Sequence, residues 1–314
     1  MRAVITVVGK DAVGILAKVS GRCSDRHINV IEVTQSILQD VFALGEEERS
    51  LLDFDGSLNL MKGAILVADR VNTVSPRYAS ELCEVAFAHG LDGILREQRH
   101  KLSGILNGID YSYYDPESDA EIAAPFCAAQ PQGKAVCKAA LQRELGLEVR
   151  EDAALFALIS RLASHKGLEL VLGACERLLQ QDVQLVVLGC GERRYEDFFR
   201  ALAARFPSRV AACIGYDRSL SKRVYAAADL FVMPSRSEPC GLSQMIASRY
   251  GAVPIVRGVG GLYDSIKPYC NSEGRVTGNG FVFADFNPDA LLHSCHEALA
   301  AFRKWEDTVD KVRY

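Results

Sequence analysis

Apolar segments alternate with amphipathic ones through the second half of the chain. Each apolar segment is short and rich in aliphatic residues, which is typical of a buried strand. The expected strands are Leu155–Ser160, Gln184–Leu188, Val210–Ile214, Leu230–Pro234 and Val253–Val256, with a further extended piece at Gly280–Phe283. Amphipathic helices fill the gaps, for instance at Leu168–Leu179 and Tyr195–Arg205. Nearly continuous apolar strands separated by helices predict an α/β fold whose parallel sheet is covered on both faces.

The pattern before this region predicts shorter elements. We expect a helix from Leu58 onward, a short strand at Val71–Val74, and a helix opened by Ser75 and Pro76. The segment GILNGID, residues 104–110, is expected to form a strand and a turn.

The first forty residues predict a small βαβ unit. Ala3–Val8 is β-branched and apolar, the GKDAVG segment turns the chain into a helix, and Ile28–Leu38 is the second expected strand. The motif around Asp11 and Gly14 resembles the start of an ACT domain, a regulatory module that often binds amino acids. Only half of that module is recognisable, so a plain strand-to-helix turn is the preferred interpretation.

Composition narrows the class of protein. The 314 residues carry a net charge of −4 and no basic stripe, which argues against a nucleic-acid partner. The ten cysteines are scattered without a CxxC pair, so a reducing cytoplasm is expected rather than a zinc or redox site. His293, Cys295 and His296 share a helix, but a solvated surface is a better explanation than a metal site. No signal peptide and no apolar run long enough for a bilayer is apparent, so no membrane partner is expected.

Charged and glycine-rich loops follow three of the predicted strands. In an open α/β sheet, ligands bind at the carboxyl ends of the strands, so these loops are expected to meet in one crevice. Arg161 and Lys166 follow the first strand, Gly215 and Tyr216 the third, and SRSEPCGLSQ (235–244) the fourth. Two cations suit a diphosphate, and amides at the start of a helix suit an anion. Ordinary helix-entry charges, and a tyrosine that packs a loop edge, are the alternatives.

These segments carry a specific resemblance. ISRLASHKG (159–167), IGYD (214–217) and SRSEPCGLSQ occur with NGID (107–110), GCGE (189–192) and GVGGLYDS (258–265) in the order found in bacterial glycogen and starch synthases. The chain resembles this ADP-glucose-dependent family, glycosyltransferase family 5, from about Leu58 to about Trp305. The resemblance implies the GT-B fold of two Rossmann-like domains, of which this chain would hold the C-terminal half.

The resemblance also implies an activity. Members transfer glucose from ADP-glucose to the non-reducing end of an α-1,4-glucan such as glycogen, with retention of configuration and without a metal or cofactor. It implies catalytic roles for Arg161 and Lys166, which stabilise the departing diphosphate, and for Glu238, which contacts the glucosyl unit as it becomes oxocarbenium-like. Preorganised opposite charges favour both ends of such a transition state, typically by about 3 kcal/mol for each contact.

The substrate-binding set implied for ADP-glucose is Asn107, Gly215, Tyr216, Cys240, Gly241, Leu242 and Ser243. Gly241, Leu242 and Ser243 would hold phosphate and ribose, whereas Gly215 and Tyr216 would line the adenine pocket.

The resemblance departs from the family at both ends. No Lys-x-Gly-Gly loop is found, and the family's last segment is absent, so we expect a truncated chain whose N-terminal domain could act in trans. The expected domains are an ACT-like unit at 1–40, a junction at 41–57, a remnant of the N-terminal domain at 58–110, a linker at 111–135 and the nucleotide-sugar-binding domain at 136–314. Two alternatives to a glucan synthase stay open: a non-catalytic nucleotide-sugar-binding domain, and an amino-acid-sensing regulator of the ACT type.

Overall fold

The computed structural model describes residues 50–272 and 275–304. The predicted ACT-like unit at 1–40 lies outside the described residues. The chain divides into two units, residues 1–63 and residues 64–314.

The described part of the first unit is a tight hairpin followed by the start of a helix. Strands β1 (Asp53–Phe54) and β2 (Ser57–Leu58) pair in an antiparallel manner. Asp55 and Gly56 connect them with φ values of 51° and 76°. Asp-Gly is the dipeptide that favours this left-handed hairpin turn. Helix α3 (Leu60–Val67) begins two residues after the predicted start at Leu58, because Leu58 pairs with Asp53 in the hairpin.

The second unit is built on a six-stranded parallel sheet. Its order is β12-β9-β8-β5-β6-β7, and every pairing in it is parallel. The strands are β5 (Ala154–Ile159), β6 (Val183–Gly189), β7 (Val210–Ile214), β8 (Leu230–Met233), β9 (Val253–Arg257) and β12 (Phe281–Phe283). All six strands predicted from the apolar segments are confirmed, with bounds that differ by at most one residue at either end.

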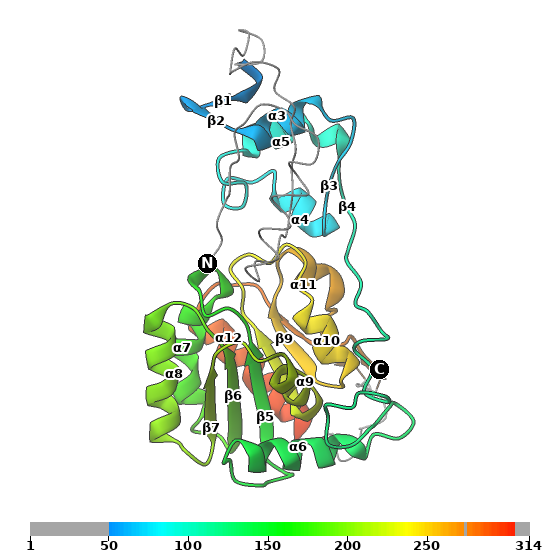
Figure 1. Ribbon diagram of the computed structural model, residues 1–314, viewed down its shortest axis with the longest axis vertical. Helices are drawn as coiled ribbons and strands as arrows, with labels where there is room; N and C mark the ends of the chain where they lie inside the picture. Colours follow the sequence, from blue (N-terminus) through cyan, green and yellow to red (C-terminus); the bar gives the residue numbers. More distant parts are fainter. Residues whose placement is uncertain (1–49, 273–274, 305–314) are drawn as a thin grey trace, which may run out of the picture. The chain divides into compact units, whose positions relative to one another are not determined.

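Helices cover both faces of this sheet, so the unit has three layers (Figure 1). One face packs against α7 (Leu168–Leu178), α8 (Arg193–Arg205) and α12 (Pro288–Phe302). The other face packs against α6 (Gly133–Glu144), α9 (Arg218–Ala227), α10 (Ser243–Arg249) and α11 (Gly260–Ser265). The predicted α/β class is therefore confirmed.

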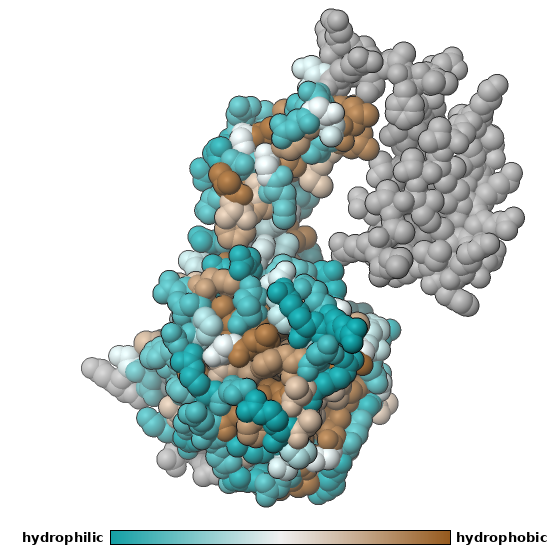
Figure 2. Space-filling view, turned by 90° about the vertical axis from the view of Figure 1, so that its left-hand side faces the viewer, coloured by the Kyte–Doolittle hydropathy of each residue, from teal (hydrophilic) through white to brown (hydrophobic). Residues whose placement is uncertain are grey.

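Alternate residues along each strand supply the two cores. In β5, Phe156 and Leu158 belong to the core on the α7 side, whereas Leu155 and Ala157 belong to the core on the α6 side. All four are at most 2% exposed. A strand buried on both faces needs apolar residues at every position, which explains the continuous apolar segments of the sequence. Figure 2 shows that hydrophilic side chains cover much of the outer surface on the side that faces the viewer.

A smaller parallel pair precedes this sheet in the same unit. Strand β3 (Val71–Thr73) pairs with β4 (Leu102–Gly104), and α4 (Pro76–Glu81), α5 (Asp92–Glu97) and a 3₁₀ turn at Arg99–Lys101 lie between them in sequence. Ser75 caps α4 by accepting the Tyr78 N–H at 2.9 Å, as expected for a helix opened by Ser-Pro.

The strand predicted within residues 104–110 was placed too late. It ends at Gly104, and no regular element covers residues 105–110. The reason is the length of its partner, because β3 offers only three residues for pairing. An added Cβ at Gly104 would lie 2.0 Å from the Ser75 carbonyl oxygen, so only glycine fits where the two segments cross.

Residues 111–135, the predicted linker, pack against the six-stranded sheet's helices. Phe126 is 4% exposed in the core on the α6 side. The buried carboxylate of Asp119 accepts hydrogen bonds from Lys222 and from the Tyr250 hydroxyl. The division at 110 and 135 stays a prediction, although α6 begins before residue 135.

Two further features complete the described chain. A short antiparallel hairpin, β10 (Cys270–Ser272) and β11 (Arg275–Thr277), was not predicted from the sequence. Within residues 50–272 and 275–304, no helix combines the length and the apolar character needed to span a bilayer. The cytoplasmic location stays a prediction.

Candidate active site

A cavity opens at the carboxyl ends of β5 and β8. Strand order reverses between these two neighbours, since β6 and β7 extend the sheet on one side of β5 while β8 and β9 extend it on the other. Ligands of open α/β sheets bind at such a switch point. The cavity has a volume of about 250 Å³. Its lining residues are Leu158, Ile159, Ser160, Arg161, Lys166, Val232, Met233, Pro234, Ser235, Glu238, Gly241, Leu242 and Ser243.

Two cations enter the cavity from the loop after β5. Arg161 lies two residues past the end of β5, and Lys166 is the last residue of the short 3₁₀ turn η2 (Ser164–Lys166). Gly167 comes next with φ of 69°, and an added Cβ there would lie 1.9 Å from the Pro234 carbonyl oxygen. The loops after β5 and β8 are therefore in direct backbone contact, and the Arg236 N–H donates to the His165 carbonyl at 3.0 Å.

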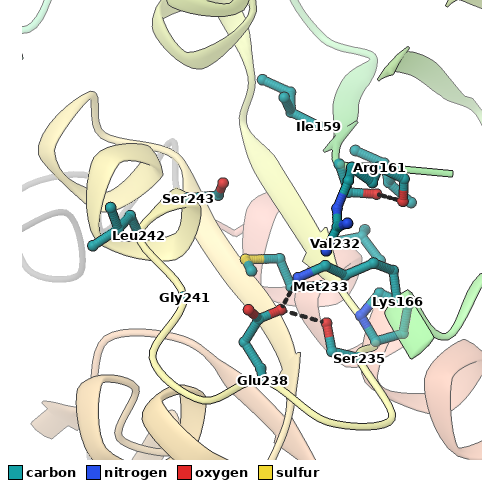
Figure 3. A pocket seen from close by; sticks show the side chains of 13 residues that line it. Ile159, Arg161, Lys166, Val232, Met233, Ser235, Glu238, Gly241, Leu242 and Ser243 are labelled. Atoms are coloured by element: carbon teal, nitrogen blue, oxygen red, sulfur yellow. Dashed lines mark hydrogen bonds and ion pairs between the residues drawn. The ribbon is translucent and has the colours of Figure 1, made fainter. Parts of the chain in front are cut away.

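A carboxylate from the loop after β8 meets these cations. Lys166 Nζ lies 2.6 Å from Glu238 Oε2, and the Ser235 hydroxyl donates to the same oxygen at 2.9 Å. Figure 3 shows the Lys166 amine and the Arg161 guanidinium directed toward the space that the Glu238 carboxylate faces. The side chain of Glu238 is 8% exposed and that of Lys166 19% exposed. The acid and the lysine therefore neutralise each other in a largely water-excluded site.

The backbone of residues 238–243 is held by its neighbours. Buried Gln244 donates through Nε2 to the Cys240 carbonyl at 3.1 Å and to the Gly241 carbonyl at 2.8 Å. The Gly261 N–H donates to the Glu238 carbonyl at 3.1 Å. These bonds fix the loop that presents Gly241, Leu242 and Ser243 to the cavity just before the first turn of α10, where helix N–H groups lack intrahelical partners.

A histidine borders the two cations. The pKa of His165 lies below its usual range, because burial disfavours the charged ring and because Lys166 and Arg161 add positive charge nearby. Arg161 Nη2 lies 3.3 Å from His165 Nε2. The ring is therefore neutral at pH 7, which leaves Arg161 and Lys166 as the charges available to an anion.

The loop after β7 does not line this cavity. Gly215 and Tyr216 follow β7, which is separated from β5 by β6, and the Tyr216 residue is 87% exposed. The loops after β5 and β8 therefore line this cavity, and the meeting of all three loops in one crevice stays a prediction. The strand order places the end of β7 at the sheet edge. The adenine role of Gly215 and Tyr216 stays a prediction.

Two other predicted site residues, the exposed Asn107 and the buried Cys240, do not line the cavity. Cys240 is 6% exposed and is not a lining residue. Burial raises the pKa of its thiol, although a hydrogen bond with the Asn107 backbone opposes this shift. The structure thus brings Asn107 next to Cys240, and both lie outside the cavity lining.

Sequence reasoning missed two residues that organise the site. Ser235 and Gln244 lie within the SRSEPCGLSQ segment (235–244). No sequence pattern indicated that Ser235 would donate to the Glu238 carboxylate or that Gln244 would donate to the loop carbonyls. Among the residues that the structure describes, no group of three metal-ligating side chains gathers. His293 is paired with Glu297 at 3.7 Å, whereas Cys295 is buried in the core.

Comparisons with known proteins match this chain to families of glycosyl transferases. The family described as glycosyl transferases group 1 matches residues 146–305, and the starch synthase catalytic domain family matches residues 30–97. The chain belongs to the group 1 glycosyl transferases. The GT-B glycosyltransferase fold that the sequence predicted is confirmed for the six-stranded unit.

Individual relatives indicate a narrower group within this family. The glycogen synthase of Anaeromyxobacter dehalogenans is 47% identical over 83% of this chain and 55% of its own length. That of Ligilactobacillus salivarius is 45% identical over 86% of this chain and 57% of its own length. The structure of starch synthase IV from Arabidopsis thaliana, bound to ADP and acarbose, is 37% identical with a TM-score of 0.75, over 81% of this chain and 52% of that one. The resemblance is confirmed, and the chain spans about half the length of these relatives.

Proposed function

We propose that this chain is the nucleotide-sugar-binding part of an ADP-glucose-dependent glycogen synthase. Its reaction transfers glucose to the non-reducing end of an α-1,4-glucan, with retention of configuration. The observation that carries the proposal is the meeting of Arg161, Lys166 and Glu238 in one cavity at the switch point of the sheet. The relatives named glycogen synthase and the starch synthase structure with bound ADP support the choice of substrate.

The charges of the cavity suit the two ends of this transition state. The bond from the sugar to the diphosphate breaks, so negative charge grows on the leaving oxygen and positive charge on the glucosyl ring. Arg161 and Lys166 stabilise the leaving diphosphate, and the Glu238 carboxylate stabilises the ring. Fixed charges in a water-poor site contribute most to such a step because they need no reorganisation.

The remaining predicted residues take supporting roles in this proposal. Gly241, Leu242 and Ser243 line the cavity and would contact phosphate and ribose. Gly215 and Tyr216, at the end of β7, would border the adenine beyond the cavity. Cys240 and Asn107 lie next to each other outside the cavity lining, and their predicted contact with the substrate would have to be made beyond the cavity. The volume of about 250 Å³ is below that of common ligand pockets, about 300–1,000 Å³. It would therefore hold the diphosphate and sugar end rather than the whole nucleotide sugar.

The direct test is transfer of labelled glucose. The protein is incubated with ADP-glucose labelled in the sugar, with glycogen as acceptor, and the label in polymer is counted. We expect incorporation that depends on ADP-glucose, is weaker with UDP-glucose, and is lost in Glu238→Gln. Binding of ADP without any incorporation would refute the catalytic part of the proposal and leave a nucleotide-sugar-binding protein. Absence of both binding and incorporation would refute the whole of it.

A further inference from the structure

The glycine pair that opens α11 is in direct contact with the loop of the candidate catalytic acid. An added Cβ at Gly260 would lie 2.0 Å from the Glu238 carbonyl oxygen, and one at Gly261 would lie 2.0 Å from the Cys240 carbonyl oxygen. No side chain fits in either gap. The start of α11 therefore acts as a template for the backbone of residues 238–240, and the Gly261 N–H donates to the Glu238 carbonyl at 3.1 Å.

A buried carboxylate from α4 holds this template. Glu81 is 1% exposed, and both of its carboxylate oxygens lie 3.1 Å from the Gly260 nitrogen. Arg77, one turn earlier, donates through Nε to Glu81 Oε1 at 2.9 Å. A buried charge is retained only where such partners compensate its desolvation, and hydrogen bonds to charged groups are stronger than those between neutral groups. Glu81 thus directly orients the peptide that precedes the Gly261 donor.

The contact between the two helices is reciprocal. Asp264 on α11 accepts the Ser75 hydroxyl at 2.5 Å and the Arg77 N–H at 3.0 Å at the start of α4. Each helix therefore supplies a carboxylate to the first turn of the other, and Figure 1 shows α4 beside α11. Two such bonds, made in opposite directions, restrict sliding between α4 and α11.

A second link reaches the same loop from β9. Arg257, the last residue of β9, donates through Nη1 to the Arg236 carbonyl at 2.9 Å. Burial lowers the pKa of Arg257, and the charge of Glu81 opposes this shift. Glu81 is therefore close enough to interact with both groups that hold the loop of Glu238, the start of α11 at Gly260 and the Arg257 guanidinium.

We propose that Glu81 is a positioning residue that sets the backbone of Glu238 through Gly260 and Gly261. This inference rests on the proposed function for its catalytic consequence. Glu81 lies outside the cavity lining and does not touch the substrate site. Its loss lets the start of α11 move, so the Glu238 carbonyl loses its fixed donor and the carboxylate loses its fixed direction. The loss of favourable contact falls on the sugar end of the substrate, which Glu238 faces, whereas Lys166 is released toward the diphosphate rather than withdrawn from it.

The test uses Glu81→Gln, which keeps the size of the side chain and removes its charge. Asp264→Asn perturbs the same helix contact from the other side, in case the first variant does not fold. Asp92→Asn is the matched control. Asp92 forms an ion pair with an arginine four residues away in α5, as Glu81 does in α4. Two quantities are measured: amide hydrogen exchange at Gly261, and the ratio of the affinities for ADP-glucose and ADP by calorimetry.

We expect Gly261 exchange to become about tenfold faster in Glu81→Gln, and the affinity ratio to shift against ADP-glucose by a similar factor. ADP affinity itself should not fall, since a less fixed Glu238 competes less for Lys166. The Asp92→Asn control should show neither change. A residue that acts through Glu238 should have no further effect on the ratio in a Glu238→Gln background, whereas a general loss of stability would act equally in both backgrounds.

Unchanged Gly261 exchange, or an equal shift of the ratio in both backgrounds, would overturn the inference. If the unaltered protein binds neither nucleotide, the proposed function fails. Gly261 exchange then decides the positioning role alone.

Discussion

The ion pair between Lys166 and Glu238 leads to an unusual expectation for ligand affinity. In the free site, the lysine that should bind the diphosphate is already engaged by the acid at 2.6 Å. An incoming diphosphate has to draw Lys166 away from Glu238 or share it. Glu238→Gln removes the competing charge, so we expect ADP to bind more tightly to this variant even though glucose transfer is lost.

The magnitude follows from the burial and the distance of the pair. Two unit charges 4 Å apart attract by about 4 kcal/mol at an effective dielectric constant near 20. Desolvation offsets much of this attraction, and a hydrogen bond to a charged group contributes about 1.5–3 kcal/mol net. If about half of that contribution is recovered when the competitor is removed, ADP affinity rises by roughly three- to tenfold. Repulsion between Glu238 and the diphosphate acts in the same direction.

Isothermal calorimetry at fixed ionic strength measures this effect. Glu144→Gln serves as control, because Glu144 pairs with Arg223 at 2.8 Å, away from the cavity. An ADP dissociation constant that is unchanged or higher in Glu238→Gln, with the control unaffected, would show that Lys166 does not bind the diphosphate.

Three further outcomes follow from the geometry of the site. Lys166→Gln should weaken ADP binding by about tenfold to a hundredfold, since it removes a charge-assisted contact; calorimetry checks this, and unchanged affinity would contradict it. Gly167→Ala should lower the free energy of unfolding by several kcal/mol, because the added Cβ would lie 1.9 Å from the Pro234 carbonyl oxygen. Gly146 has the same φ of 69° but open space around it, so Gly146→Ala should lower it by only about 1 kcal/mol. Equal losses in thermal unfolding would refute the close approach at Gly167. Because the pKa of His165 is lowered in the folded protein, the unfolded state binds more protons just below pH 6.5. The free energy of unfolding should therefore fall as the pH drops through the folded-state pKa of His165. In urea titrations, His165→Gln should reduce the slope of this free energy against pH. An identical slope in both proteins would count against the shift.

Hydrophobic pattern and chain order were sufficient to predict the scaffold. Continuous apolar segments such as Leu155–Ser160 can be buried only on both faces, so the parallel sheet and its strands followed from the sequence. The rule that ligands bind at the carboxyl ends of strands then selected the loops that carry Arg161, Lys166 and Glu238. The structure brings those three residues together in one cavity.

The pairings across long sequence distances could not be predicted. Lys166 and Glu238 are 72 residues apart, and Glu81 and Gly260 are 179 apart, so local pattern carries no information on either contact. Strand order was also inaccessible, which is why Tyr216 was expected in the same cavity as Lys166. The GVGGLYDS segment could be recognised as a motif, but the backbone contact that requires Gly260 and Gly261 appears only in three dimensions.

A crystal structure of this protein with ADP tests the central claim most directly. We expect diphosphate oxygens within hydrogen-bond distance of Arg161 and Lys166, with the Lys166 amine moved from Glu238 toward the phosphates. A diphosphate bound elsewhere, with the Lys166–Glu238 pair intact at 2.6 Å, would contradict it.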